Sequence, residues 1–154
     1  MHKPLEDLTH KDIHVIDVFA GTGAFGLEAI SRGAVFASFI ENNAAALAVL
    51  RANIAKLRFQ SSTAVIALNA LSLSHWRGTP AQLVFADAPY HSGDGLIAIT
   101  SLIRIGAVAN GAVIVVETEK TETLDIERIN TPALKVIDAR SYGKTMLHFL
   151  TYQA

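Results

Sequence analysis

Acidic side chains stand at the ends of three apolar runs in this sequence. Asp17 lies near the end of a run rich in β-branched residues, Glu41 follows a second run, and Asp87 closes a third. Such runs predict buried strands of a parallel sheet. Ligands bind such a sheet beyond the carboxyl ends of its strands, where the strand order reverses. We therefore expect the three carboxylates to share one edge, where they could hold hydroxyl groups, amino groups or a cation.

A glycine-rich turn follows Asp17. Gly21, Gly23 and Gly26 satisfy the spacing G-x-G-x-x-G between the first strand and a helical pattern. A strand, a glycine turn and a helix in this order place backbone N–H groups at a helix N-terminus, facing whatever binds there. Glycine permits positive φ values and a close approach of the ligand. The spacing alone fits dinucleotides and several other nucleotide-like ligands.

Asp17 changes which ligand this turn favours. A carboxylate beside the turn would repel a pyrophosphate but suits a ligand with positive charge. S-adenosylmethionine carries a sulfonium and an ammonium group and no phosphate. The alternative is that Asp17 only caps the turn. We predict a cofactor site for S-adenosylmethionine at Asp17, Phe19, Ala20, Gly21, Thr22 and Gly23.

Two later polar residues extend this cofactor site. Glu41 lies 18 residues after Gly23 (41 − 23), close to the offset of about 20 residues at which an acid binds a ribose diol in such folds. The alternative is an exposed acid near a helix start, where the helix dipole favours it. Asn69 follows the third strand and could bind the adenine edge, or it could be a simple N-cap. Asn42 and Ala70 complete the predicted cofactor residues.

The segment Asp87-Ala88-Pro89-Tyr90 predicts the chemistry. The Asp87 carboxylate and the Ala88 carbonyl can accept the two N–H hydrogens of an exocyclic amino group, which orients its lone pair at a methyl group. Tyr90 could stack on the ring, and Pro89 limits the movement of the loop. Methyl transfer then depends mainly on proximity and alignment. We predict all four as catalytic residues; an ordinary Asp-x-Pro turn is the alternative.

The order of these motifs resembles the bacterial methyltransferases that modify a guanine N2 in 16S ribosomal RNA. The resemblance covers residues 17–34, 41–42, 69–70, 87–90, 115–117 and 142–145. It implies S-adenosylmethionine as cofactor, with S-adenosylhomocysteine as product, and catalysis at residues 87–90. It also implies 16S ribosomal RNA within the small ribosomal subunit as partner.

The sequence departs from the pattern of that family at three places. Ala88 stands where the family usually has Pro, which keeps the carbonyl group but loosens it. Asn69 stands where an Asp is usual, and its amide can still accept a hydrogen bond. The family also carries a basic, arginine-containing segment before the first motif, and this chain starts too late to include it. We expect either a truncated form or weak RNA binding.

The resemblance and the alternation of strands and helices imply an α/β fold, a Rossmann-like class I methyltransferase. The sheet should be mostly parallel and seven-stranded, with a C-terminal antiparallel hairpin and helices on both faces. The predicted strands are 13–19, 35–40, 63–68, 83–87, 112–117, 134–139 and 146–152. The predicted helices are 23–32, 43–58 and 96–105, with a short helical piece from 69 towards 76.

Composition limits the classes of function. With 154 residues, 51% of them hydrophobic, we expect one domain (1–154) with an irregular lead-in at 1–12. The absence of cysteine excludes disulfides and thiolate metal sites. The histidines lack ligand spacing, so we expect no metal. No apolar run is long enough for a membrane helix, and we expect a cytoplasmic protein. The net charge of −1 argues against strong autonomous nucleic-acid binding.

Three other functions remain open from the residues alone. A nicotinamide-dependent oxidoreductase would explain the glycine spacing but gives residues 87–90 no role. A relative that binds the cofactor without turnover would keep the glycine turn. A methyltransferase acting on DNA or on protein amides would use the same geometry for an amino group.

Overall fold

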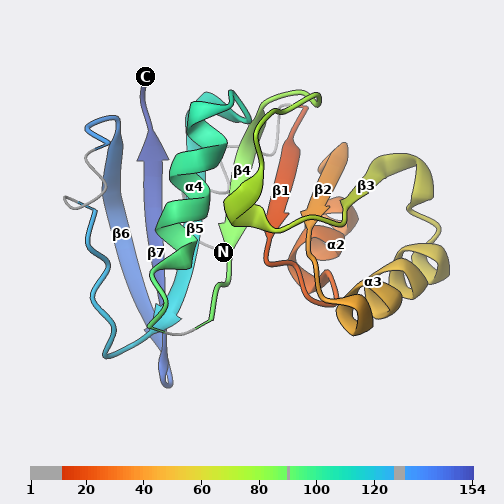
Figure 1. The fold of residues 1–154 in the computed structure, drawn as a ribbon, viewed down its shortest axis with the longest axis horizontal. Coiled ribbons are helices and arrows are strands. Elements are labelled where there is room, and N and C mark those ends of the chain that lie inside the picture. Colours follow the sequence, from red (N-terminus) through yellow and green to blue (C-terminus); the bar gives the residue numbers. More distant parts are fainter. Residues whose placement is uncertain (1–11, 90, 127–130) are drawn as a thin grey trace.

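The computed structural model describes residues 12–89, 91–126 and 131–154, in which strands and helices alternate (Figure 1). The first half contains β1 (His14–Val18), α2 (Ala24–Ser31), β2 (Phe36–Ile40), α3 (Ala44–Leu57), the 3-10 turn η1 (Gln60–Ser62) and β3 (Thr63–Ile66). The second half contains η2 (Ala70–Ser72), β4 (Ala81–Ala86), α4 (Asp94–Arg104), β5 (Val108–Glu119), β6 (Leu134–Tyr142) and β7 (Thr145–Tyr152).

The seven strands form one sheet in the order β3-β2-β1-β4-β5-β7-β6. The first five strands are parallel, and β7 is antiparallel to both β5 and β6. The chain proceeds from β1 outward through β2 and β3, then returns to the other side of β1 with β4 and β5. The strand order therefore reverses between β1 and β4. The predicted mostly parallel sheet with a C-terminal antiparallel hairpin is confirmed.

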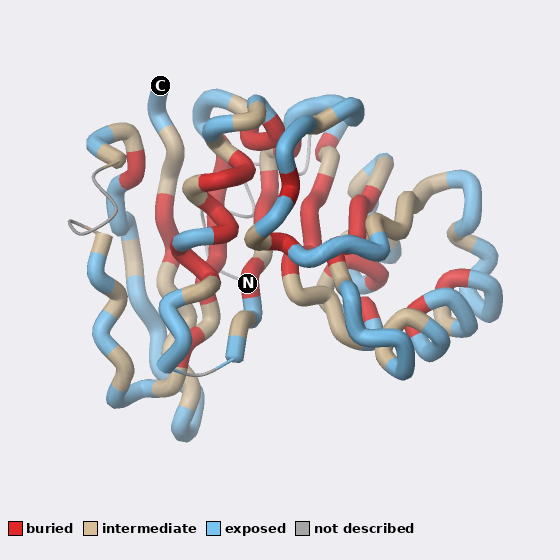
Figure 2. Tube along the Cα trace, in the orientation of Figure 1, coloured by how far each residue is buried: buried red, intermediate tan, exposed pale blue. Residues whose placement is uncertain are grey.

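Alternating side chains of the central strands feed two separate apolar cores. In β1, Ile16 and Val18 belong to a core that includes α4, whereas Val15 belongs to a core that includes α2 and α3. This alternation follows from the two-residue period of a strand. Buried segments accordingly run along the central strands and the inner side of α4 (Figure 2). The prediction of helices on both faces is confirmed.

The strand boundaries differ from the prediction at two glycines. β5 begins at Val108, four residues before the predicted start at 112. Gly111 directly precedes that predicted start, and a glycine in this place is typical of a turn. In the structure Gly111 (φ +82°) lies inside β5, at an irregularity in its pairing with β4. β6 and β7 extend into the predicted turn, and only Gly143 and Lys144 separate them, with Gly143 at φ +60°. A two-residue hairpin needs such positive φ values.

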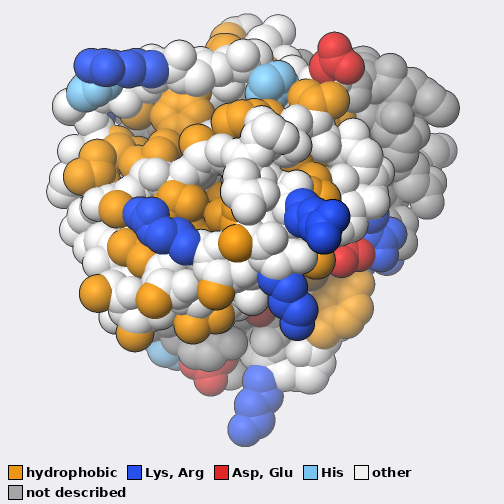
Figure 3. All heavy atoms as spheres, turned by 90° about the vertical axis from the view of Figure 1, so that its right-hand side faces the viewer, with side chains coloured by type: hydrophobic (Ala, Val, Ile, Leu, Met, Phe, Trp, Pro, Cys, Tyr) orange, Lys and Arg blue, Asp and Glu red, His pale blue; other side chains and the backbone are white. Residues whose placement is uncertain are grey.

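One edge of the sheet is formed by β3, with α3 beside it. That side of the molecule shows apolar side chains interspersed with Lys and Arg (Figure 3). Val49, Leu57 and Leu68 are among the large apolar residues exposed in the described part of the chain. A four-residue edge strand offers little backbone for pairing with another chain. None of the described helices is long and apolar enough to cross a membrane.

Gly26 determines how closely α2 can lie on the sheet. A Cβ atom at this position would stand 2.4 Å from a ring carbon of Phe39 and 3.3 Å from Oδ2 of Asp17. Phe39 is completely buried in β2, so its ring has no free space to move into. The third glycine of the turn is therefore required by packing of the helix on the sheet.

We predict that Gly26→Ala lowers the free energy of unfolding by about 1–3 kcal/mol, because the added methyl group overpacks the core. Urea unfolding followed by circular dichroism measures this change. Gly78→Ala is the matched control, because Gly78 is exposed in a loop. Its added Cβ would lie 3.2 Å from the ring of Trp76, which is only half-buried. The control should change stability by less than about 0.5 kcal/mol. Equal losses in the two variants would contradict the packing argument.

Candidate functional site

The glycine turn uses several of its N–H groups inside the protein. α2 begins at Ala24 after the left-handed N-cap Gly23. Three bonds of 2.9 Å join Gly21 N–H to Glu41 Oε1, Gly23 N–H to the Ala20 carbonyl, and Gly26 N–H to Asp17 Oδ2. The prediction of free N–H groups facing the ligand is therefore wrong for these three glycines.

Asp17 lies beneath the turn and is only 2% exposed. Its carboxylate accepts the N–H of Gly26, the third residue of α2, so it caps that helix, as the alternative prediction held. The pKa of Asp17 is raised from 3.8 to about 7. Burial is the main cause, the Gly26 bond opposes it, and the charges of Asp87 and Glu41 add to the increase. Direct contact of Asp17 with a cofactor stays a prediction.

Glu41 joins the end of β2 to the glycine turn. Its Oε1 accepts from Gly21 N–H at 2.9 Å, and its Oε2 accepts from the N–H groups of Asn42 (2.9 Å) and Asn43 (2.8 Å). Each carboxylate oxygen has two acceptor sites, so these three bonds leave one site, on Oε1, for a hydroxyl group of a ligand. Glu41 is therefore both a fixed part of the scaffold and a candidate ribose acceptor.

Asn69 begins the short turn η2. Its Oδ1 accepts from Leu71 N–H at 2.9 Å, so the predicted N-cap role is confirmed. Ala70, beside it, is buried. The Asn69 side chain is exposed at the same time, and its amide nitrogen carries two donors. Capping therefore does not exclude the predicted contact with an adenine edge.

A cavity of about 610 Å³ brings the two halves of the predicted site together. This volume is in the range of small-molecule sites. Glu41 from β2 and Asp87 from β4 open into this one cavity, as the sequence argument requires. The residues that line it are Phe19, Glu41, Asn42, Asn69, Leu71, Asp87, Ala88, Pro89 and Asp94.

The other predicted residues support the cavity or lie outside the described part of the chain. Ala20 N–H donates to the Ile40 carbonyl at 3.1 Å, and the Thr22 carbonyl accepts from Asn53 Nδ2 at 3.0 Å. These bonds hold the turn against β2 and α3. Tyr90 lies outside the described residues, and its stacking role stays a prediction.

Sequence reasoning missed three residues of this region. Leu71 and Asp94 line the cavity, and Glu117 shares a hydrogen bond with Asp87. Glu117 ends the predicted strand 112–117, so the signal that selected Glu41 and Asp87 could have found it. Asp94 lies between the predicted catalytic segment 87–90 and the predicted helix 96–105, where no site residue was expected. Nothing in the sequence marked Leu71.

Asp87 and Glu117 follow paired residues of adjacent strands, since Ala86 of β4 pairs with Val116 of β5. Desolvation by burial raises the pKa of both carboxyl groups. Repulsion by Asp87 raises the pKa of Glu117 further. Their shared hydrogen bond lowers the pKa of Asp87 and raises that of Glu117. These directions favour the neutral form of Glu117 over that of Asp87.

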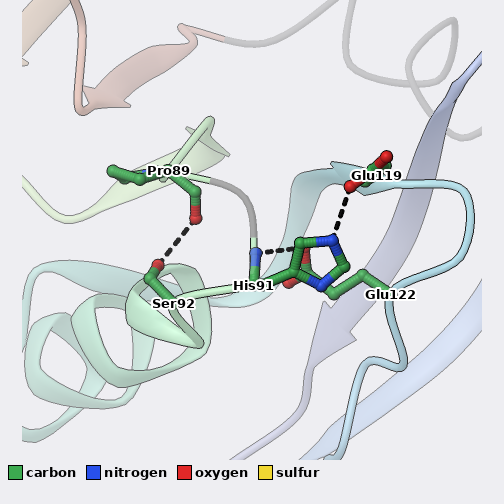
Figure 4. A network of polar contacts seen from close by, with 5 residues as sticks. All are labelled: Pro89, His91, Ser92, Glu119 and Glu122. Carbon is green, nitrogen blue, oxygen red and sulfur yellow. Dashed lines mark hydrogen bonds and ion pairs between the residues drawn. The ribbon is translucent and has the colours of Figure 1, made fainter.

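The loop after β4 is fastened to the end of β5 (Figure 4). His91 N–H donates to Glu122 Oε1 at 2.7 Å, and the His91 ring contacts the Glu119 carboxylate through Nε2. On the other side, Ser92 Oγ donates to the Pro89 carbonyl at 2.7 Å. These contacts restrict the loop that carries Ala88 and Pro89, as in-line group transfer would need.

A second cavity of about 550 Å³ lies beyond this loop. Ala88 and Pro89 line both cavities. Glu117 lines the second cavity and is absent from the described lining of the first. The residues 88–89 therefore form part of a common wall. Among the described residues, no group of three or more His, Asp or Glu side chains could hold a metal ion.

Residues 5–151 match the family described as Conserved hypothetical protein 95. The chain belongs to this family. Ribosomal RNA small subunit methyltransferase D of Escherichia coli K12 is 40% identical to it over 108 residues, which are 70% of this chain and 54% of the relative. The protein of the same name from Buchnera aphidicola of Acyrthosiphon pisum is 31% identical over 122 residues, or 77% of this chain and 62% of that relative.

A solved structure extends the similarity from the sequence to the fold. The "putative methylase" of Haemophilus influenzae superimposes with a TM-score of 0.83 at 27% identity, covering 97% of this chain and 94% of that one. The predicted class I methyltransferase fold is confirmed. The chain spans about half the length of the Escherichia coli relative.

The pH dependence of stability tests the burial of Asp17. Between the unfolded pKa of 3.8 and the folded pKa of about 7, the folded state keeps a proton that the unfolded state releases. Stability of the natural protein therefore falls as pH rises through this window. In Asp17→Asn, an amide oxygen still accepts from Gly26 and nothing titrates. Between pH 4 and pH 8, the free energy of unfolding of the natural protein should therefore fall by roughly 2–4 kcal/mol relative to that of Asp17→Asn.

Urea unfolding of both proteins at several pH values gives this difference. The change with pH is the measured quantity, so a constant cost of burying the asparagine amide does not affect it. Parallel curves for the two proteins would contradict the assignment of a raised pKa to Asp17.

Proposed function

We propose that the chain transfers a methyl group from S-adenosylmethionine to the exocyclic N2 amino group of a guanine in 16S ribosomal RNA, within the small ribosomal subunit. The observation that carries this proposal is the single cavity shared by Glu41 and Asp87. The names of the Escherichia coli and Buchnera relatives support ribosomal RNA as the substrate. The proposal includes a cytoplasmic location, where that substrate is found.

The charge of the cavity suits this cofactor. Its described lining includes three acidic residues, Glu41, Asp87 and Asp94, and no Lys or Arg. Such a lining attracts the sulfonium and ammonium groups and repels phosphate. When bound, S-adenosylmethionine supplies a methyl group on a good leaving group. Glu41 would accept a ribose hydroxyl through Oε1, and Asn69 would bind the adenine edge.

A nicotinamide dinucleotide fits the same cavity poorly. Its pyrophosphate would meet the acidic lining, and the N–H groups of Gly21, Gly23 and Gly26 already donate to protein oxygens. Phosphate binding at a helix N-terminus needs such N–H groups to be available. We therefore favour the methyltransferase over the oxidoreductase that the glycine spacing alone would permit.

The exocyclic amino group of the guanine would bind at the carboxyl end of β4. The Asp87 carboxylate and the Ala88 carbonyl would each accept one N–H, so that the nitrogen lone pair points at the methyl carbon. Pro89 and the bonds of the following loop would keep these two acceptors in place. A guanine stacked in a helix could not reach this wall, so the target base would be flipped out or already unpaired.

The proposal is tested with labelled S-adenosylmethionine, purified small subunits and naked RNA, followed by nucleoside analysis. We expect N2-methylguanine from the natural chain and a loss of at least about 100-fold in rate for Asp87→Ala, with cofactor affinity changed by less than about threefold. Glu28→Gln is the control, since Glu28 is exposed on α2 and pairs with Arg32.

The outcomes separate the possible functions. Methylation of an atom other than guanine N2 would contradict the proposed substrate. Cofactor binding without methyl transfer would support the alternative of a non-catalytic cofactor-binding protein. Equal loss of transfer and of cofactor affinity in Asp87→Ala would contradict the role assigned to Asp87.

Removal of the Glu41 carboxylate should weaken cofactor binding. For Glu41→Ala we expect a loss of about 1–3 kcal/mol in the binding free energy of S-adenosylhomocysteine, because a ligand hydroxyl loses a charged acceptor. Titration calorimetry measures this loss. Since Glu41 also holds Gly21, Asn42 and Asn43, the unfolding free energy is measured in parallel. Unchanged affinity in a folded variant would refute the ribose contact.

A further inference from the structure

Glu117 contacts the proposed methyl-transfer site through Asp87. The two residues come directly after the paired positions Ala86 and Val116, so their side chains leave neighbouring strands at the same edge of the sheet. Asp87 opens into the cofactor cavity, and Glu117 opens into the second cavity. The hydrogen bond between the two carboxyl groups therefore crosses the wall between the cavities.

A hydrogen bond between two carboxyl groups requires that one of them keeps a proton. Glu117 is the group that keeps it, since desolvation and the charge of Asp87 both favour its neutral form. In this state the Glu117 O–H donates and the Asp87 carboxylate accepts.

Several other titratable groups surround this pair. Asp17 of β1 repels Asp87 from one side. His148 of β7 lies opposite Val116, and burial lowers its pKa while the charge of Glu122 raises it. Asp94 at the start of α4 lines the cofactor cavity together with Asp87. None of these groups is a fixed cation. On the side of β5, the charge of Asp87 is therefore offset by the proton of Glu117.

We propose, on the basis of the function above, that Glu117 is a positioning residue for methyl transfer. Its protonated carboxyl group donates to Asp87 and holds the Asp87 carboxylate ionised and in place to accept the N–H of the substrate amino group. Asp87 has two oxygens and about four acceptor sites, so the bond from Glu117 leaves acceptors for the substrate. When Glu117 loses its proton, Asp87 loses the donor that holds it, and the two negatively charged carboxylates repel each other.

Two substitutions at position 117 separate the donor from the rest of the side chain. Glu117→Gln keeps the shape and offers amide N–H donors, whereas Glu117→Ala removes the donor. With labelled S-adenosylmethionine and small subunits, we expect Glu117→Ala to lower kcat by about 10- to 100-fold. Glu117→Gln should stay within about threefold of the natural chain. Affinity for S-adenosylhomocysteine should be unchanged in both, with the exposed Glu28→Gln as matched control.

The pH profile distinguishes this role from a purely structural one. The rate of the natural chain should fall on the alkaline side, as Glu117 loses its proton and the donor with it. Glu117→Gln should show no such fall, because an amide does not titrate. If Glu117→Gln is as impaired as Glu117→Ala, or keeps the alkaline fall of the natural chain, the proposal is overturned.

Titration of the Asp87 carboxyl carbon by NMR supplies a readout that needs no substrate. The Glu117 bond lowers the pKa of Asp87, so Glu117→Ala should raise that pKa and Glu117→Gln should leave it nearly unchanged. Identical titration of Asp87 in all three proteins would overturn the proposal. If the natural chain methylates no substrate, the proposed function fails, and this titration still decides whether Glu117 controls Asp87.

Discussion

Four carboxyl groups gather at one edge of the sheet, and this site depends on that constraint. Burial is the main cause that raises the pKa of Asp17, Asp87 and Glu117, and repulsion adds to the increase at Asp17 and Glu117. Asp17, Glu41, Asp87 and Glu117 lie at the carboxyl ends of β1, β2, β4 and β5, which are neighbours in the sheet. Burial and like charges both disfavour ionised carboxyl groups unless donors or cations offset them. The fold supplies a different donor to three of them: the first turn of α2 to Asp17, three backbone N–H groups to Glu41, and Glu117 itself to Asp87.

The same constraint links the architecture to the ligand. Backbone donors offset only part of the negative charge, and Asp17 still has a pKa raised to about 7. A cationic ligand in the cavity would relieve the repulsion, whereas a phosphate ligand would add to it. The parallel sheet thus creates an acidic edge, and this edge explains why a glycine turn with dinucleotide-like spacing would hold a sulfonium compound.

Much of this arrangement could be predicted from the sequence, because it depends on local patterns and on parallel topology. The runs rich in β-branched residues identified the strands, and an acid at the end of each run marked the edge where a ligand binds. Once Glu41 and Asp87 are placed on parallel strands of one sheet, their convergence follows from geometry. The motif at 87–90 and the first motif carried the family resemblance, which the match over residues 5–151 confirmed.

The rest depended on contacts that sequence patterns do not encode. Whether Asp17 faces a ligand or caps α2 depends on its side-chain direction and on the close approach that Gly26 permits. The partnership of Asp87 with Glu117 requires knowing that β4 and β5 are adjacent and in which register. The early start of β5 has the same origin, since an irregularity in its pairing with β4 absorbs the turn signal at Gly111.

A crystal structure with S-adenosylhomocysteine bound tests the central claim most directly. We predict that the ligand occupies the cavity of about 610 Å³, with a ribose hydroxyl hydrogen-bonded to Glu41 and its sulfur facing the wall formed by Asp87, Ala88 and Pro89. A ligand bound outside this cavity, or a ribose turned away from Glu41 with the sulfur remote from Asp87, would contradict the account.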